Sequence, residues 1–266
     1  MSSIDRYFSL YISHNIHVSL MVVCLYVTTV LEWGLLLLGA PIAIVFLGSF
    51  LSYSFIKKPV YFFSSLTRFY RLRGGGIYFL SALLFGGLLL NTAVPDKIIF
   101  FSAGCLVFFY VFPQSRYINL RRLSGIKIYI VSLSWVLITG VLPFENYDWS
   151  TPHYLYQLQR FLLIILATLP FELRDLKADD PRLKTLAQSL GFSGVQLLGY
   201  GLSFFIFLVS GALHYLYGIA AYSALVLLPF YLWSLSDIKR LSSPYFVSFW
   251  VEWIPFFGLI FLYFYR

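Results

Sequence analysis

The acidic residues that follow one long apolar segment have the types and the spacing of a cation site. Glu172, Asp175 and Asp179 are three and four residues apart, so a helix would carry all three carboxylates on one face. Carboxylates at the edge of a membrane helix are costly unless they hold a cation or meet a charged substrate. Mg²⁺ binds a few carboxylates and shares its other positions with water and phosphate oxygens. The stretch therefore predicts chemistry on a diphosphate at a membrane surface, the alternative being a solvated loop of alternating charges.

Basic residues elsewhere in the chain supply groups that would bind such a substrate. Arginine binds phosphate oxygens through two parallel hydrogen bonds, and lysine acts as a compact positive charge. The predicted diphosphate-binding residues are Lys57, Lys58, Arg116, Arg121 and Lys184. Tyr110, Arg174 and Asp180 are further candidates, because they lie in the same basic and acidic stretches. For any single basic residue, the alternative is that it only marks the cytoplasmic side of a membrane.

The composition predicts an integral membrane protein. Of the 266 residues, 60% are hydrophobic and 11% are charged, whereas a soluble domain carries about 25% charged residues. A net charge of +8 would suit nucleic acid in a soluble protein, but the positive-inside rule explains it here, so we expect no nucleic-acid partner. Cys24 and Cys105 lie in separate apolar segments and are expected to be packing residues, not a disulfide.

Nine apolar segments are long enough to cross a hydrocarbon core, which takes about 20 helical residues. They lie near 14–32, 34–56, 77–94, 97–113, 126–143, 153–171, 192–213, 215–235 and 244–264. Pro170 is expected to kink or end the sixth of them. We therefore predict an all-α, polytopic membrane protein that forms one domain over residues 1–266.

The lysines and arginines give this arrangement a direction. With a cytoplasmic N-terminus, the cytoplasmic loops are 57–76, 114–127, 172–191 and 236–243. Every lysine and arginine lies in these loops or in the N-terminal segment, except Lys97, Arg160 and Arg266. By the positive-inside rule, the chain has nine transmembrane helices, a cytoplasmic N-terminus and a C-terminus outside.

Three charged residues lie within or near the apolar segments, namely Glu32, Arg160 and Glu252. Ionisable groups inside a membrane usually face the bundle and find a partner there. Arg160 is expected to pair with Glu32 or with Glu252, and the sequence leaves both choices open.

Two stretches resemble motifs of the UbiA-type intramembrane prenyltransferases. Residues 172–186 contain Glu-x-x-Asp-x-x-x-Asp and then Lys-Thr-Leu, which resembles the family's second aspartate-rich motif. Glu172 replaces the first aspartate, and Ala187 stands where proline is usual. The stretch from Tyr110 to Arg116 resembles the family's Tyr-Ser-x-x-Lys-Arg segment after the fourth helix. Nine helices with an active face toward the cytoplasm also match.

The chain departs from the family at the end of the second predicted helix. The family's first motif, Asn-Asp-x-x-Asp-x-x-x-Asp, is missing there, because residues 52–62 contain no acid. In the family, both motifs bind Mg²⁺ and thereby the donor diphosphate. Lys57 and Lys58 would partly replace the lost metal by pairing directly with phosphate.

The resemblance implies a Mg²⁺-dependent transfer of a polyprenyl group from a prenyl diphosphate to a lipophilic acceptor, such as an aromatic or quinone-precursor molecule. It implies that Glu172, Asp175 and Asp179 hold Mg²⁺ and that the two aspartates are catalytic. It also implies that Arg116, Lys57 and Lys58 neutralise the diphosphate. The site would face the cytoplasm from the cell (inner) membrane. The alternatives are a non-catalytic homologue that binds an isoprenoid lipid and, more weakly, a small transporter with Arg160, Glu32 and Glu252 as its polar path.

Overall fold

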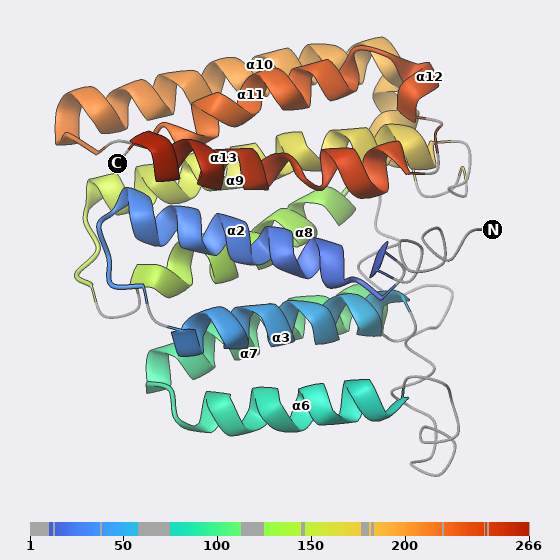
Figure 1. Cartoon of the computed structure of the whole chain (residues 1–266). Coiled ribbons are helices and arrows are strands. Elements are labelled where there is room, and N and C mark those ends of the chain that lie inside the picture. The colour runs from blue at the N-terminus through green and yellow to red at the C-terminus, as the bar shows by residue number, and fades with distance from the viewer. Residues whose placement is uncertain are drawn as a thin grey trace.

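The described part of the chain consists of helices joined by turns and short connections, and it contains no strand (Figure 1). In this computed structural model the described residues are 11–12, 14–37, 39–57, 75–112, 125–144, 147–176, 181, 184–219, 221–241, 243 and 245–265. The helices lie side by side in a single bundle, with α10 and α11 along one edge and α6 along the opposite edge.

A long helical segment in the described residues overlaps each of the nine predicted apolar segments. The first four are α2 (Ile16–Glu32), α3 (Gly39–Lys57), α6 (Gly75–Leu90) and α7 (Val94–Val111). The fifth is α8 (Lys127–Val136), which continues through a π-turn (Leu137–Val141) and a 3-10 turn (Leu142–Phe144). The next three are α9 (Thr151–Asp175), α10 (Leu186–Tyr217) and α11 (Ser223–Leu235). After the short α12 (Ile238–Leu241), the last segment joins a π-turn (Phe246–Val251) to α13 (Ile254–Tyr265).

Six of these segments are long and apolar enough to cross a membrane. They are α3, α7, Lys127–Phe144, α9, α10 and Phe246–Tyr265. The other three, α2, α6 and α11, are apolar but shorter. The chain is therefore an all-helical, multi-pass membrane protein, as its composition predicts.

The predicted loop over 172–191 is wrong at both of its ends. Helix α9 continues through Pro170 to Asp175, because the turn after the proline is held by burial of Glu172 and Leu173. Helix α10 begins at Leu186, and its backbone breaks at Gly191, where φ is 64°. A positive φ is accessible to glycine because it lacks a Cβ atom. Glu172 and Asp175 therefore lie on a helix inside the bundle and not in a loop.

Helix α10 shows why an apolar exterior suits this chain. Leu197, Tyr200, Phe204 and Phe207 are exposed on one side, with 54% to 72% of each residue uncovered. The opposite side packs into the largest buried cluster through residues such as Ile206. A helix that is apolar on both its packed face and its outer face is typical of a membrane span.

Gly199 on α10 allows close packing against two neighbouring helices. A Cβ atom there would lie 2.6 Å from Leu235 Cδ1 and 3.6 Å from Leu166 Cδ1. Small residues at such contacts let membrane helices approach each other closely. We expect Gly199→Ile to lower the free energy of unfolding by about 1–3 kcal/mol through overpacking. Gly201→Ile is the matched control, because nothing lies within 4 Å of its Cβ position. Equal denaturant midpoints in detergent for the two variants would contradict this packing role.

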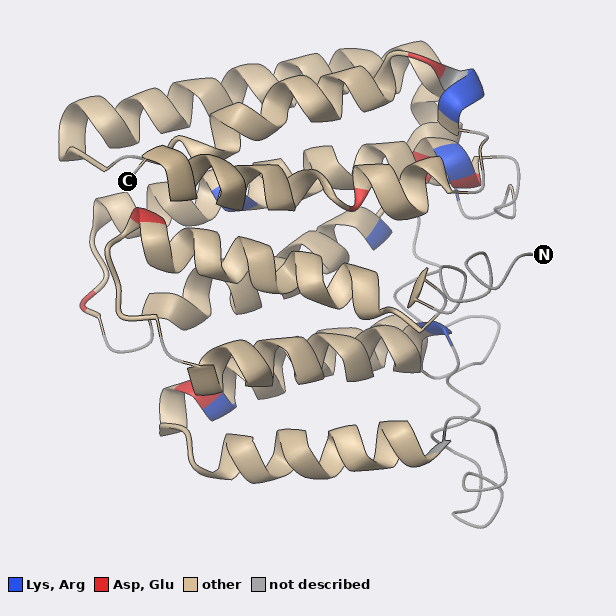
Figure 2. Cartoon of the chain, viewed as in Figure 1, with Lys and Arg blue, Asp and Glu red and all other residues tan. Residues whose placement is uncertain are grey.

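The first and last helical segments run in the same direction. His17, near the start of α2, stacks on Phe249 in the final π-turn, with ring centroids 5.0 Å apart. At the other end of α2, the Glu32 carboxylate accepts a hydrogen bond from the Ser223 N–H at the start of α11 (2.9 Å). The segments α2 and Phe246–Tyr265 therefore begin at one end of the bundle. Most of the charged residues lie near the ends of the helices, and the middle of the bundle carries few of them (Figure 2).

Candidate functional site

A cavity of about 540 Å³ lies between α2, α3, α7, α8, α9 and the last segment. Most of its wall is apolar and includes Val22, Val45, Val107, Ile164 and Val251. Pockets that bind small molecules commonly measure about 300–1,000 Å³ and combine apolar walls with a few polar groups. The cavity is therefore large enough for a ligand, and its wall suits an apolar one.

Five charged residues at one end of the cavity form what we call the charged end. They are Lys57, Lys127, Glu172, Arg174 and Asp175. They come from the end of α3, the start of α8 and the end of α9. Because neighbouring helices run in opposite directions, these ends meet at one side of the bundle.

Glu172 is buried at the charged end and is held by a cation from another helix. Its side chain is 2% exposed, and its Oε1 lies 2.9 Å from Lys127 Nζ. A buried carboxylate without a partner would destabilise the fold by several kcal/mol, so the pairing explains how it is tolerated. Lys127 is the first residue of α8, and the ion pair therefore fixes α8 against α9.

Arg174 and Asp175 form a second ion pair at the charged end. Arg174 donates from Nε to Asp175 Oδ1 (2.7 Å) and from Nη2 to Oδ2 (3.1 Å). Its Nη1 donates to Ser248 Oγ in the last segment (2.9 Å). The guanidinium group also lies over the Phe171 ring, 5.2 Å from its centroid. One arginine thus connects α9 with the last segment beside the cavity.

The structure brings together part of the predicted site. Five of the predicted residues line the cavity, namely Lys57, Tyr110, Glu172, Arg174 and Asp175. Lys184 is exposed and does not line it. The remaining five predictions, Lys58, Arg116, Arg121, Asp179 and Asp180, lie outside the described residues. The predicted metal face is therefore represented by two of its three carboxylates.

The Lys-Thr-Leu sequence has a structural role in starting α10. Thr185 is the N-cap residue, and its side-chain oxygen accepts a hydrogen bond from the Gln188 N–H (3.3 Å). Gln188 Oε1 in turn accepts a hydrogen bond from the Thr185 N–H (2.9 Å). This reciprocal capping box satisfies backbone donors that a helix start leaves open. A Thr with Gln three residues later is a signal that could have placed the start of α10 correctly.

The described carboxylates are compatible with Mg²⁺. Within the described ranges, no group of three or more His, Cys, Asp or Glu residues is arranged to hold a metal ion. Glu172 and Asp175 nevertheless line the same cavity from one helix. Mg²⁺ is commonly bound through one or two carboxylates plus substrate phosphates and water. Two carboxylates beside a cavity therefore fit this ion.

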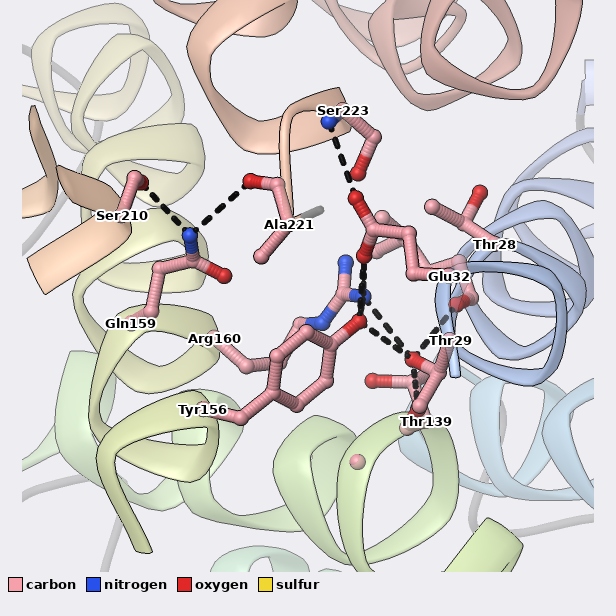
Figure 3. A network of polar contacts seen from close by, with 12 residues as sticks. Thr28, Thr29, Glu32, Thr139, Tyr156, Gln159, Arg160, Ser210, Ala221 and Ser223 are labelled. Atoms are coloured by element: carbon pink, nitrogen blue, oxygen red, sulfur yellow. Dashed lines mark hydrogen bonds and ion pairs between the residues drawn. The ribbon is translucent and has the colours of Figure 1, made fainter. Parts of the chain in front are cut away.

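Arg160 is the centre of a separate polar network (Figure 3). It is 1% exposed, and its Nη2 lies 3.8 Å from Glu32 Oε2. Nη2 also donates to Thr29 Oγ1 (2.8 Å) and to the Tyr156 hydroxyl. The Tyr156 hydroxyl donates to Glu32 Oε2 (2.6 Å), and the Ser223 N–H donates to Oε1. Of the two partners open to Arg160, the structure selects Glu32.

Sequence reasoning missed one residue of the site and left open whether Glu252 pairs with Arg160. Ser248, the anchor for Arg174, lies 74 residues away in sequence and carries no local signal. Glu252 lines the cavity and does not join the Arg160 network. An acid within an apolar segment is a signal that a polar site is nearby, but it does not say which helix faces the acid.

Comparisons with protein-family models, with curated proteins and with solved structures find no match for this chain. The arrangement can hold an apolar molecule in the cavity and an anionic group at the charged end. The function must therefore be argued from this cavity and its charges.

Proposed function

We propose that the chain is a membrane prenyltransferase of the UbiA type, which transfers a polyprenyl group from a prenyl diphosphate to a lipophilic acceptor. One observation carries the proposal: the cavity has mostly apolar walls and has Lys57, Lys127 and Arg174 beside two carboxylates at one end. A prenyl diphosphate is complementary to this arrangement, because it joins a long apolar chain to an anionic head.

The charged end supplies the groups that the departing diphosphate needs. Lys57, Lys127 and Arg174 bind the phosphate oxygens, and Tyr110 lies in the wall nearby. Glu172 and Asp175, together with Asp179, would hold Mg²⁺, which neutralises the negative charge on the leaving diphosphate. Positive charge placed where the leaving group develops its negative charge lowers the barrier to breaking the allylic C–O bond. The apolar walls exclude water from the cation that results.

The two ion pairs make the charged end ready for a charge-balanced exchange. In the structure, Lys127 is paired with Glu172 and Arg174 with Asp175. With a diphosphate and a divalent cation bound, Glu172 and Asp175 would hold the metal, and Lys127 and Arg174 would bind phosphate oxygens. Each of these four side chains has a partner of opposite charge before and after this exchange, which keeps its cost low.

The topology completes the proposal. Nine helices cross the membrane, with the N-terminus in the cytoplasm and the C-terminus outside. The parallel directions of α2 and the last segment support an odd number of crossings. Lys57, Lys127 and Arg174 all lie at the charged end, which the positive-inside rule assigns to the cytoplasm. The donor therefore enters from the cytoplasmic face of the cell (inner) membrane.

A second candidate is a non-catalytic homologue that binds an isoprenoid lipid. Residues 52–62 contain no acid, so the family's first metal motif is missing. Both described carboxylates of the second motif already have cationic partners. These two observations favour binding without chemistry.

The purified chain in nanodiscs, supplied with labelled prenyl diphosphates of several lengths, separates the two candidates. The enzyme proposal predicts saturable, Mg²⁺-dependent binding with release of diphosphate. Saturable binding without release would establish the lipid-binding homologue. Absence of binding at every chain length would contradict both.

A further inference from the structure

Glu252 lies on the cavity wall where the last helical segment is interrupted. The π-turn Phe246–Val251 ends there, and α13 starts two residues later at Ile254. π-turns are rare and occur frequently at functional sites. Glu252 follows Ser248, the residue that accepts from Arg174, by four residues. Glu252 therefore lines the cavity next to the charged end, within electrostatic reach of Lys57 and Arg174.

Among the described residues, the Glu252 carboxylate meets no strong hydrogen-bond donor. His17 Nε2 lies 4.0 Å from Oε2, and Lys57 and Arg174 act on the carboxylate through their charge without a hydrogen bond to it. His17 Nε2 already donates to the Phe249 carbonyl oxygen (3.1 Å), and Nδ1 contacts the Tyr11 hydroxyl (2.9 Å). Glu252 keeps 20% exposure of its side chain, and it lines the cavity. In contrast, Glu32 and Glu172 are each bound by donors from other helices.

Tyr53 adds a hydrogen-bond donor to the same cavity. Its hydroxyl oxygen accepts a hydrogen bond from Trp135 Nε1 (2.9 Å), and the indole ring packs edge-on against the phenol. A hydroxyl that accepts from an indole keeps its own hydrogen for donation. Tyr53 lines the cavity and lies within electrostatic reach of Glu252. The cavity thus offers one acceptor and one donor within an otherwise apolar surface.

We propose that Glu252 and Tyr53 form a binding site for the hydroxyl group of a lipophilic alcohol or phenol. The ligand hydroxyl donates to the Glu252 carboxylate and accepts from the Tyr53 O–H. A buried carboxylate is costly without a hydrogen-bond donor, so the ligand supplies the hydrogen bond that the described residues do not give Glu252. The identification of this ligand as the prenyl acceptor rests on the proposed function, whereas the binding site does not.

The test compares binding of 4-hexylphenol with that of its methyl ether, 4-hexylanisole, which cannot donate a hydrogen bond. Both are titrated into the full chain in nanodiscs, and uptake by empty nanodiscs is subtracted. We expect the phenol to bind about 10-fold more tightly or better, because hydrogen bonds to charged groups are the strong ones. Glu252→Gln should reduce this preference to about twofold. Asp148→Asn, at an exposed acid away from the cavity, should leave it unchanged.

Equal binding of the two probes by the native chain would overturn the proposal, as would a preference that survives Glu252→Gln. If Glu252→Gln does not fold, the native probe pair and Tyr53→Phe decide, since the tyrosine variant removes the donor to the ligand oxygen and should weaken binding of the phenol. The test uses no prenyl donor. Failure of diphosphate release would therefore refute the proposed enzyme without affecting the hydroxyl site. Equal binding of the two probes would refute the hydroxyl site without affecting the proposed enzyme.

Discussion

Asp175→Asn is expected to lower the rate of diphosphate release by about 100-fold or more, because a carboxylate that would hold Mg²⁺ against the leaving diphosphate is lost. Asp175 lines the cavity and is bound bidentately by Arg174. Asparagine has nearly the same shape, so the side chain can still accept from Arg174 through one oxygen. The negative charge needed to hold Mg²⁺ is gone, whereas the fold is retained. The measurement is the initial rate with a labelled prenyl diphosphate and saturating Mg²⁺.

Asp96→Asn is the matched control for this variant. Asp96 lies in the first turn of α7, away from the cavity lining. It should retain the native rate, and both variants should unfold at similar denaturant concentrations. Full activity of Asp175→Asn, or an equal loss in Asp96→Asn, would remove Asp175 from the site.

Arg160→Met should lower the free energy of unfolding by about 3–5 kcal/mol, the usual cost of breaking a buried ion pair from one side. The substitution leaves the Glu32 carboxylate buried opposite an apolar side chain, although Tyr156 and Ser223 still donate to it. Methionine roughly preserves the volume of the arginine stem, so cavity formation contributes little. Chemical denaturation in detergent measures the change.

The double variant Arg160→Met with Glu32→Gln isolates the charge effect. Replacing both members of a buried ion pair is often close to neutral, because no charge is then left unpaired. The double variant should therefore be more stable than Arg160→Met alone. If the second substitution only adds to the loss, the two residues do not act as a pair, and the network in Figure 3 is stabilised in another way.

Much of the fold could be predicted because apolar run length decides where a membrane helix can form. Each predicted segment overlaps a helix of the described residues, and six of those helices are long enough to span. The boundary after Pro170 could not be predicted, because the following turn is held by tertiary burial of Leu173 and Glu172. Helix α10 begins at Leu186, before the predicted start near residue 192, because Thr185 caps it. The capping sequence is visible in the chain, but a prediction from hydropathy does not use it.

The site was predictable only where its residues are close in sequence. Helical spacing correctly placed Glu172 and Asp175 together, since residues three apart share a helix face. The partners Lys127 and Ser248 are 45 and 74 residues away from Glu172 and Arg174, so their contacts follow from how the helices pack. The same holds for Arg160, whose pairing with Glu32 depends on α2 lying against α9.

Photo-crosslinking tests most directly whether the cavity holds a prenyl diphosphate, with an analogue that carries a diazirine at the end of its prenyl chain. We expect Mg²⁺-dependent labelling of residues in the cavity wall, such as Val45, Val107 and Ile164. Unlabelled prenyl diphosphate should compete for this labelling, and the corresponding prenyl alcohol should compete poorly. Labelling confined to exposed residues of α10, such as Leu197 and Phe204, would rule out binding in the cavity, because the prenyl group would then lie on the outer surface of the bundle.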